Sequence, residues 1–222
     1  MYNLLLGVLC PRYLEIYEQY SSSPKMQAEF DNHQKTFNYV SRNSGLNVTR
    51  FIDVYKLYFG LSTETEYGFT LPSWLNAVWP DTIVDLAIRE YYVSMATTEM
   101  RKMATGYLLK KIVEDAKNKI ISNTNNNKFG KKIYLYSAHE NNVAELLISL
   151  GVFEPHVPNY GAYTIIEVHK MNNEYGIKIL YENYDGDGPQ VLKIPGCNTF
   201  CPINKFVSLI EEYLTTEDLC GN

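Results

Sequence analysis

The sequence lacks any apolar run that approaches the roughly 20 residues needed for a membrane-spanning helix. Residues 1–10 are apolar, but they have neither the basic start nor the small-residue cleavage site of a signal peptide. Positive charge is also scarce: Lys and Arg total 20 against 25 Asp and Glu, which gives a net charge of −5. Because nucleic-acid binders usually carry a cationic face, this balance argues against such a partner. A glycine-rich phosphate loop and a serine or cysteine nucleophile motif are also missing from the sequence.

Cysteine is scarce as well, with 4 residues that allow three pairings. Cys197 and Cys201 flank a short turn that contains Pro and Gly, and a bridge between them would close a small loop. Cys10 and Cys220 lie near opposite ends of the chain and would join the termini. A zinc site with four cysteines is the alternative, but two isolated cysteines without clustered histidines match zinc-ligand spacing poorly. We therefore favour disulfides, which indicate an oxidising compartment.

A chain of 222 residues, 45% hydrophobic and 20% charged, has ordinary globular composition. Apolar residues at helical spacing predict helices in the first half, and the pattern then changes to alternating strands and helices. The predicted helices of the first half cover residues 13–20, 30–41, 47–59, 80–103 and 106–121. The second half is predicted to contain strands 133–138, 163–169 and 175–182, a hairpin turn at 171–173, and helices 141–150 and 203–214. No linker is long enough to separate two independent domains.

One motif is chemically distinctive. The predicted strand after Ile133 ends in the pair His139-Glu140, and an amphipathic helix follows directly. Ligands of open α/β sheets bind at the carboxyl ends of strands, and the start of a helix favours an anion. A phosphate is therefore the predicted guest. The alternative is structural: Glu140 and Asn141 serve the first turn of the helix, and His139 ends the strand.

The segment Tyr134-Leu-Tyr-Ser-Ala-His139-Glu140 resembles the C-terminal signature of the histidine acid phosphatases, in which Ser-Ala-His-Asp closes a strand and opens a helix. Further matching pieces occur in the family's order: Leu9-Cys-Pro-Arg-Tyr13, Phe69-Thr-Leu-Pro-Ser-Trp74, Gly151-Val-Phe153, Val157-Pro-Asn-Tyr160, Pro195-Gly-Cys197 and Cys201-Pro202. The resemblance spans essentially the whole chain and is greatest to the prostatic, lysosomal and insect venom enzymes.

The resemblance implies an α/β fold, with a histidine-phosphatase-like (phosphoglycerate-mutase-like) core that is incomplete at the N-terminus and an α-helical cap. Residues 1–11 would end the N-terminal core segment, 12–104 would form the cap, and 105–222 would form the C-terminal part of the core. The family's Arg-His-Gly-x-Arg-x-Pro motif, which carries the nucleophilic His, has no counterpart here. None of His33, His139, His156 and His169 follows Arg or precedes Gly. The chain thus resembles the C-terminal part of a larger enzyme.

Carried over residue by residue, His139 would bind phosphate, and Glu140 would protonate the leaving group where most relatives have Asp. The resemblance implies the pairs Cys10–Cys220 and Cys197–Cys201, and chemistry without a metal or other cofactor. We interpret His33, His156 and His169 as surface or core histidines.

The expected function is hydrolysis of small phosphate monoesters through a phosphohistidine, by a secreted or lysosomal acid phosphatase. The sequon Asn47-Val-Thr49 fits a glycoprotein, and a homodimer stays open. One alternative is a catalytically inactive, truncated secreted binding protein of the same fold. Another is an inositol-phosphate or lysophosphatidate phosphatase of the same superfamily.

Overall fold

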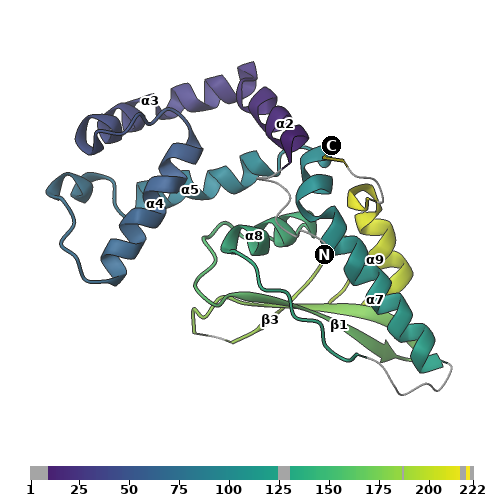
Figure 1. Cartoon of the computed structure of the whole chain (residues 1–222). Helices are drawn as coiled ribbons and strands as arrows, with labels where there is room; N and C mark the ends of the chain where they lie inside the picture. Colours follow the sequence, from purple (N-terminus) through teal and green to yellow (C-terminus); the bar gives the residue numbers. More distant parts are fainter. Residues whose placement is uncertain (1–9, 125–130, 187, 216–218, 221–222) are drawn as a thin grey trace. The chain divides into compact units, whose positions relative to one another are not determined.

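A computed structural model of the chain describes residues 10–124, 131–186, 188–215 and 219–220. These residues form two compact units (Figure 1). The helical unit contains Glu15–Ala96 together with Pro155–Val157. The sheet unit contains the described residues up to Leu14, Thr97–Glu154, and those from Pro158 onward.

The helices of the helical unit begin and end where local side chains satisfy the backbone. Ser23 precedes the second helix, and its Oγ accepts a hydrogen bond from the Met26 amide at 3.3 Å. Gly45, with φ of 75°, ends that helix in the left-handed conformation that glycine adopts without strain. The elements are α2 (Pro11–Ser21, which starts in the sheet unit), α3 (Pro24–Ser44), α4 (Phe51–Glu66), the 3₁₀ helix η1 (Ser73–Ala77) and α5 (Asp81–Ser94).

Aromatic rings fill the core of the helical unit. Phe30, Phe37 and Phe51 are almost wholly buried. The ring centroids of Phe30 and Phe51 lie 5.2 Å apart, and those of Phe37 and Phe51 lie 6.0 Å apart, both edge to face. Because this geometry is the favoured one for aromatic pairs, the unit has a specific core of its own.

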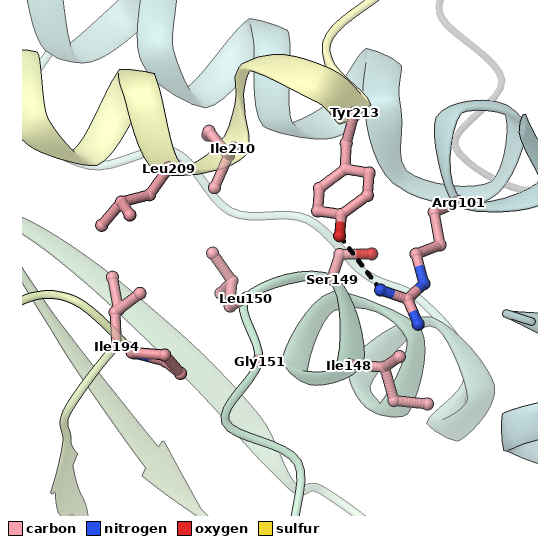
Figure 2. A pocket seen from close by; sticks show the side chains of 10 residues that line it. Arg101, Ile148, Ser149, Leu150, Gly151, Ile194, Leu209, Ile210 and Tyr213 are labelled. Carbon is pink, nitrogen blue, oxygen red and sulfur yellow. Dashed lines mark hydrogen bonds between the residues drawn. The ribbon is translucent and has the colours of Figure 1, made fainter. Parts of the chain in front are cut away.

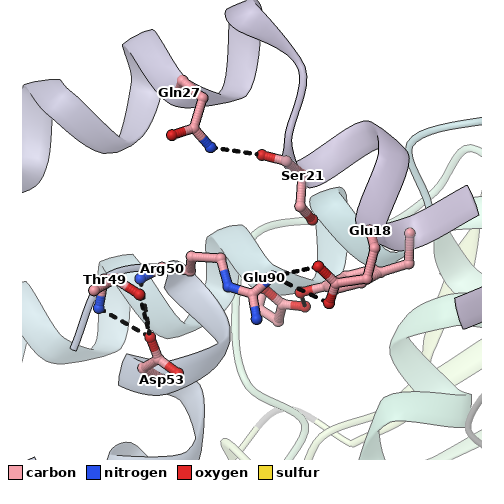
Figure 3. A network of polar contacts seen from close by, with 8 residues as sticks. Glu18, Ser21, Gln27, Thr49, Arg50, Asp53 and Glu90 are labelled. Atoms are coloured by element: carbon pink, nitrogen blue, oxygen red, sulfur yellow. Dashed lines mark hydrogen bonds and ion pairs between the residues drawn. The ribbon is translucent and has the colours of Figure 1, made fainter. Parts of the chain in front are cut away.

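A buried carboxyl group lies beside this core, in the polar network of Figure 3. Glu90 is only 5% exposed, and the Tyr17 hydroxyl donates a hydrogen bond to its Oε1 at 2.8 Å. Burial raises the pKa of Glu90 to about 7, although the Tyr17 hydrogen bond and the Arg50 charge act in the opposite direction. Arg50 is itself held by Glu18, with 2.9 Å between Nη1 and Oε2.

The sheet unit is built on an antiparallel sheet in which β2 is central. β1 pairs with β2 from Tyr163↔Glu182 to Met171↔Glu174, and β3 and β4 both pair with β2. The β1–β2 hairpin closes through Asn172 and Asn173, whose φ angles of 49° and 66° suit a two-residue turn. The strands are β1 (Tyr163–Met171), β2 (Glu174–Glu182), β3 (Gln190–Leu192) and β4 (Cys201–Pro202). The helices are α6 (Thr98–Arg101), the π-helix η2 (Lys102–Gly106), α7 (Tyr107–Thr124), α8 (Glu140–Ser149), α9 (Ile203–Ile210) and the 3₁₀ helix η3 (Glu211–Tyr213).

The core of the sheet unit lies where β2 meets α7, α8 and α9 (Figure 1). One apolar cluster joins residues from all four elements, among them Leu109, Leu146, Ile179 and Phe206. Two disulfides bind the same unit. Cys10 is joined to Cys220, with 4.9 Å between the Cα atoms, and Cys197 is joined to Cys201, with 5.4 Å. These are the pairs that the resemblance implies.

The structure confirms the helix expected at 141–150, the strands expected at 163–169 and 175–182, and the hairpin turn between them. The strand predicted at 133–138 is wrong: these residues form a segment without helix or strand, in which Leu135 is 84% exposed. A strand exists only beside a hydrogen-bonded neighbour, and none of the four described strands pairs with this segment. Of the expected α/β architecture, the described residues show the coarser features: a mostly helical fold with a small antiparallel sheet.

Other differences concern boundaries. The helix expected at 30–41 begins earlier, at Pro24, and the one expected at 47–59 runs from Phe51 to Glu66. The long helix expected at 80–103 ends at Ser94, and α6 starts after the cap Thr97. Of the N-terminal core segment expected at 1–11, residues 1–9 lie outside the described residues.

The raised pKa of Glu90 predicts a pH-dependent stability. A carboxyl whose pKa rises from 4.5 to about 7 on folding contributes stability that is fully present below pH 4.5 and lost as the pH passes about 7. Because of this group, we expect the free energy of unfolding to fall by roughly 2 kcal/mol when the pH is raised from 5 to 8. Urea unfolding of the Glu90→Gln variant should show a correspondingly weaker pH dependence. The exposed Glu64→Gln is the matched control, and an unchanged pH dependence in Glu90→Gln would contradict the assignment.

Candidate functional site

The candidate site lies at the start of α8. His139 is the residue before the helix, with extended backbone angles of φ −90° and ψ 166°. Its carbonyl accepts hydrogen bonds from the amides of Asn142 at 3.1 Å and Val143 at 3.4 Å. The His139 side chain is exposed, and Glu140, the first helical residue, is half-buried. Both therefore stand at the helix end where unpaired amides and the dipole favour negative charge.

Asn142 fixes the backbone of His139. Its Oδ1 accepts a hydrogen bond from the His139 amide at 3.1 Å, as in a capping box. Its Nδ2 donates to Oε2 of Glu145 at 3.3 Å. Neither Asn142 nor Glu145 was among the residues predicted from the sequence. Two features of the sequence could have identified them. Asn142 is a polar residue three positions after the cap of the helix, and Glu145 is an acidic residue next to the apolar positions of an amphipathic helix.

Glu145 is a buried acid one turn further along α8. It is 8% exposed, and burial raises its pKa to about 7, with a further increase from the Glu140 charge and a decrease from the Asn142 hydrogen bond. The group is therefore mostly protonated at mildly acidic pH. A neutral carboxyl at this place adds no negative charge next to a site that is expected to receive an anion.

A pocket lies at the other end of α8, and neither His139 nor Glu140 lines it. It has a volume of about 250 Å³, and Figure 2 shows Arg101 donating from Nη1 to the Tyr213 hydroxyl at 3.0 Å. Leu150, Ile194 and Leu209 make most of the remaining lining apolar. We place the candidate chemistry at the start of α8 rather than here, because the titratable pair lies there.

The other histidines are described within their own units. His33 packs on Phe51, at 5.5 Å between ring centroids, and lies 3.7 Å from Glu29 in the helical unit. His169 lies 2.7 Å from Glu167 on β1. His156 belongs to the helical unit, whereas His139 belongs to the sheet unit. Within the described ranges, no three metal-ligating side chains cluster, and no helix is long and apolar enough to cross a bilayer.

Comparison with known proteins defines the class. The model of the histidine phosphatase superfamily (branch 2) matches residues 3–182. The chain belongs to this family, the histidine acid phosphatases.

Particular relatives extend the match over most of the chain. The chain is 31% identical to venom acid phosphatase Acph-1 of Apis mellifera, over 97% of this chain and 55% of the relative. It is 26% identical to prostatic acid phosphatase of Bos taurus, over 94% of this chain and 54% of the relative. It is 25% identical to lysosomal acid phosphatase of Homo sapiens, over 91% and 48% respectively. The chain thus spans about half the length of the curated relatives it matches.

The contacts of Asn142 predict a measurable role in fixing the site. Asn142→Ala should lower the free energy of unfolding by about 1 kcal/mol, because the His139 amide loses its cap. It should also speed hydrogen exchange at that amide. Asn141→Ala, next to it on α8, is the matched control and should change neither quantity. Equal losses in the two variants would show that the Asn142 contacts are not what holds His139.

Proposed function

We propose that this chain supplies the phosphate-binding and proton-donating part of an acid phosphatase that hydrolyses phosphate monoesters. The observation that carries the proposal is the placement of His139 and Glu140 at the amino end of α8. His139 resembles the His of the family's Ser-Ala-His-Asp signature, Glu140 stands where that signature has Asp, and the chain belongs to this family. Relatives named as venom, prostatic and lysosomal acid phosphatases support the reaction class.

The roles follow from the chemistry of the two side chains. As an imidazolium, His139 would donate a charge-assisted hydrogen bond to a phosphate oxygen, and the first amides of α8 would add uncharged donors. Glu140, in its protonated form, would give its proton to the leaving alkoxide. In this proposal, one phosphoryl group bound at the start of α8 would meet both side chains, because His139 and Glu140 are adjacent residues at that helix end. Catalysis would then consist of holding charges where they develop, without a metal or other cofactor.

The covalent step requires a nucleophile that we do not assign to any of the 4 histidines. None of them has the Arg before it and the Gly after it that mark the family's nucleophile. In the proposal, that histidine belongs to the part of the enzyme that this chain does not span. The helical unit would act as a cap beside the completed site. This chain alone would therefore bind phosphate and turn over little or no substrate.

Phosphate binding tests the proposal directly. Titration of the chain with inorganic phosphate at pH 5 should move the imidazole NMR signals of His139 and leave those of His169 unmoved. His139→Ala should weaken phosphate binding at least about tenfold, because a charge-assisted hydrogen bond contributes more than 1.4 kcal/mol. His169→Ala is the matched control, since it removes a partly exposed histidine from the same unit.

Turnover separates the proposal from its alternatives. Hydrolysis of p-nitrophenyl phosphate by the chain alone, abolished in both His139→Ala and Glu140→Ala, would show that no outside nucleophile is needed. Absence of phosphate binding in the unmodified chain would favour the catalytically inactive binding protein. Preference for an inositol phosphate or lysophosphatidate over p-nitrophenyl phosphate would favour the other phosphatase class of the superfamily.

We propose secretion or lysosomal residence for the protein. The two disulfides of the structure are typical of oxidising compartments. Asn47 is exposed in the loop between α3 and α4, where an acceptor asparagine has to lie. Thr49 completes the sequon and donates from Oγ1 to Oδ2 of Asp53 at 3.2 Å.

Glycosylation of Asn47 gives a simple test. Protein secreted from insect cells should lose apparent mass on treatment with an N-glycosidase, and Asn47→Gln should remove this shift. The conservative Thr49→Ser keeps the sequon and should keep the shift. A mass unaffected by the enzyme would contradict the assignment.

A further inference from the structure

The buried acid Glu145 is linked to the backbone of His139 by two hydrogen bonds that share one side chain. Asn142 Nδ2 donates to Oε2 of Glu145 at 3.3 Å, and Asn142 Oδ1 accepts from the His139 amide at 3.1 Å. All three residues lie within the first two turns of α8 or directly before it. A change at Glu145 can therefore reach the candidate phosphate site without any movement of the helix.

The chemistry of an amide side chain makes this link directional. The nitrogen Nδ2 donates hydrogen bonds, and the oxygen Oδ1 accepts them. Because the Glu145 carboxyl accepts at Nδ2, the amide of Asn142 presents Oδ1 to the N–H of His139, as the structure shows. An apolar residue at position 145 would remove this acceptor, and with it part of the preference for the capping orientation. Glu145 thus helps to select the orientation of Asn142 that caps His139.

The surroundings of Glu145 leave a negative charge there uncompensated. The side chain is 8% exposed, and acids are rarely so buried unless they are paired. Burial raises its pKa to about 7, and among the described residues the Asn142 hydrogen bond lowers the pKa and the Glu140 charge raises it. In the same part of the chain, no lysine of the elements that pack with α8 is among these groups, neither Lys102 of η2 nor those of α7, β2 and α9. Ionisation of Glu145 therefore adds negative charge near the helix end that bears Glu140.

We propose that Glu145 is a positioning residue of the candidate phosphate site: it holds His139 through Asn142, and anion binding there weakens when Glu145 ionises. The second part rests on the proposed function, because it needs an anion bound at His139. Below about pH 7 the carboxyl is mostly neutral, and as the pH rises through this value the ionised carboxylate repels the anion. Linkage acts in both directions, so a bound anion also raises the pKa of Glu145. The buried acid in this way sets an upper pH limit for binding, in addition to the protonation of His139.

Two variants separate the hydrogen bond from the charge. Glu145→Gln keeps a carbonyl acceptor for Asn142 and removes the charge, whereas Glu145→Leu removes both. Hydrogen exchange at the His139 amide should stay within about twofold in Glu145→Gln and become at least about fivefold faster in Glu145→Leu, because the cap is weakened. Exchange in β2 is the reference for overall stability. Equal exchange at His139 in the unmodified chain and both variants would overturn the positioning role.

Inorganic sulfate is the probe for the charge, because it stays a dianion across the pH range of the test and phosphate does not. Its dissociation constant is measured from the His139 imidazole NMR signals at pH 5.5 and pH 8, at constant ionic strength. The unmodified chain and Glu145→Gln should bind sulfate equally at pH 5.5, and at pH 8 the unmodified chain should bind at least about fivefold more weakly. Glu114→Gln, which removes an exposed carboxyl of α7, is the matched control and should behave as the unmodified chain. The same ratio at both pH values would overturn the proposal.

A third measurement needs no ligand. The carboxyl NMR signal of Glu140 should show an inflection near pH 7 in the unmodified chain, because the two acids act on each other, and Glu145→Gln should lose it. Absence of sulfate binding in both chains, with this inflection and the exchange differences present, would count against the proposed function and support the hold of Glu145 on His139. Sulfate binding without the inflection would support the proposed function and overturn the role of the Glu145 charge.

Discussion

The burial of α8 is the constraint on which the candidate site depends. Ala144, Leu147 and Leu150 are at most 2% exposed, and the helix packs into the cluster that also contains β2, α7 and α9. Only the first turn reaches solvent. Because close packing at its carboxyl end fixes the orientation of α8, the core also sets the positions of the residues at its amino end.

Polar contacts also hold α8 in place. Ser149, near its carboxyl end, hydrogen-bonds Thr105 of η2 at 2.8 Å, and both side chains are buried. Next to it, the backbone oxygen of Tyr213 occupies the space that a Cβ on Gly106 would need. Only glycine permits this approach of η3 to η2. The 3₁₀ helix η3 is therefore packed closely against η2, the element that hydrogen-bonds α8.

Local patterns in the sequence were sufficient for much of the fold. Helical spacing identified α8 and most helices of the first half, and Asn172-Asn173 between two β-rich runs marked the hairpin. Placement of His139 and Glu140 at a helix start was predictable for the same reason, because both the cap and the apolar face of α8 lie within a few residues of the pair. The start of α3 was placed too late: the helix was predicted from residue 30, whereas Ser23 is its cap and Pro24 its first residue.

The predictions that failed, and the contacts that were missed, depended on hydrogen-bond and disulfide partners that a local sequence pattern does not show. The residues from Ile133 to Ser137 have the composition of a strand, but composition cannot supply the neighbour that makes a strand. The Asn142–Glu145 contact was missed because a buried acid looks like a surface residue in a sequence, unless its hydrogen-bond partner is known. Pairing of Cys10 with Cys220 could not be derived from spacing and came only from the family resemblance.

That pairing changes what a cut in the chain means. The bridge joins residues that are 210 positions apart, so most of the 222 residues of this chain lie within one covalent ring. A single proteolytic cut between Cys10 and Cys220, in an exposed loop such as the one around Tyr67, would open the ring without releasing a fragment. The two pieces would stay together through extraction and purification and would separate only under reducing conditions. The chain can in this way be cut once and still remain one covalent molecule.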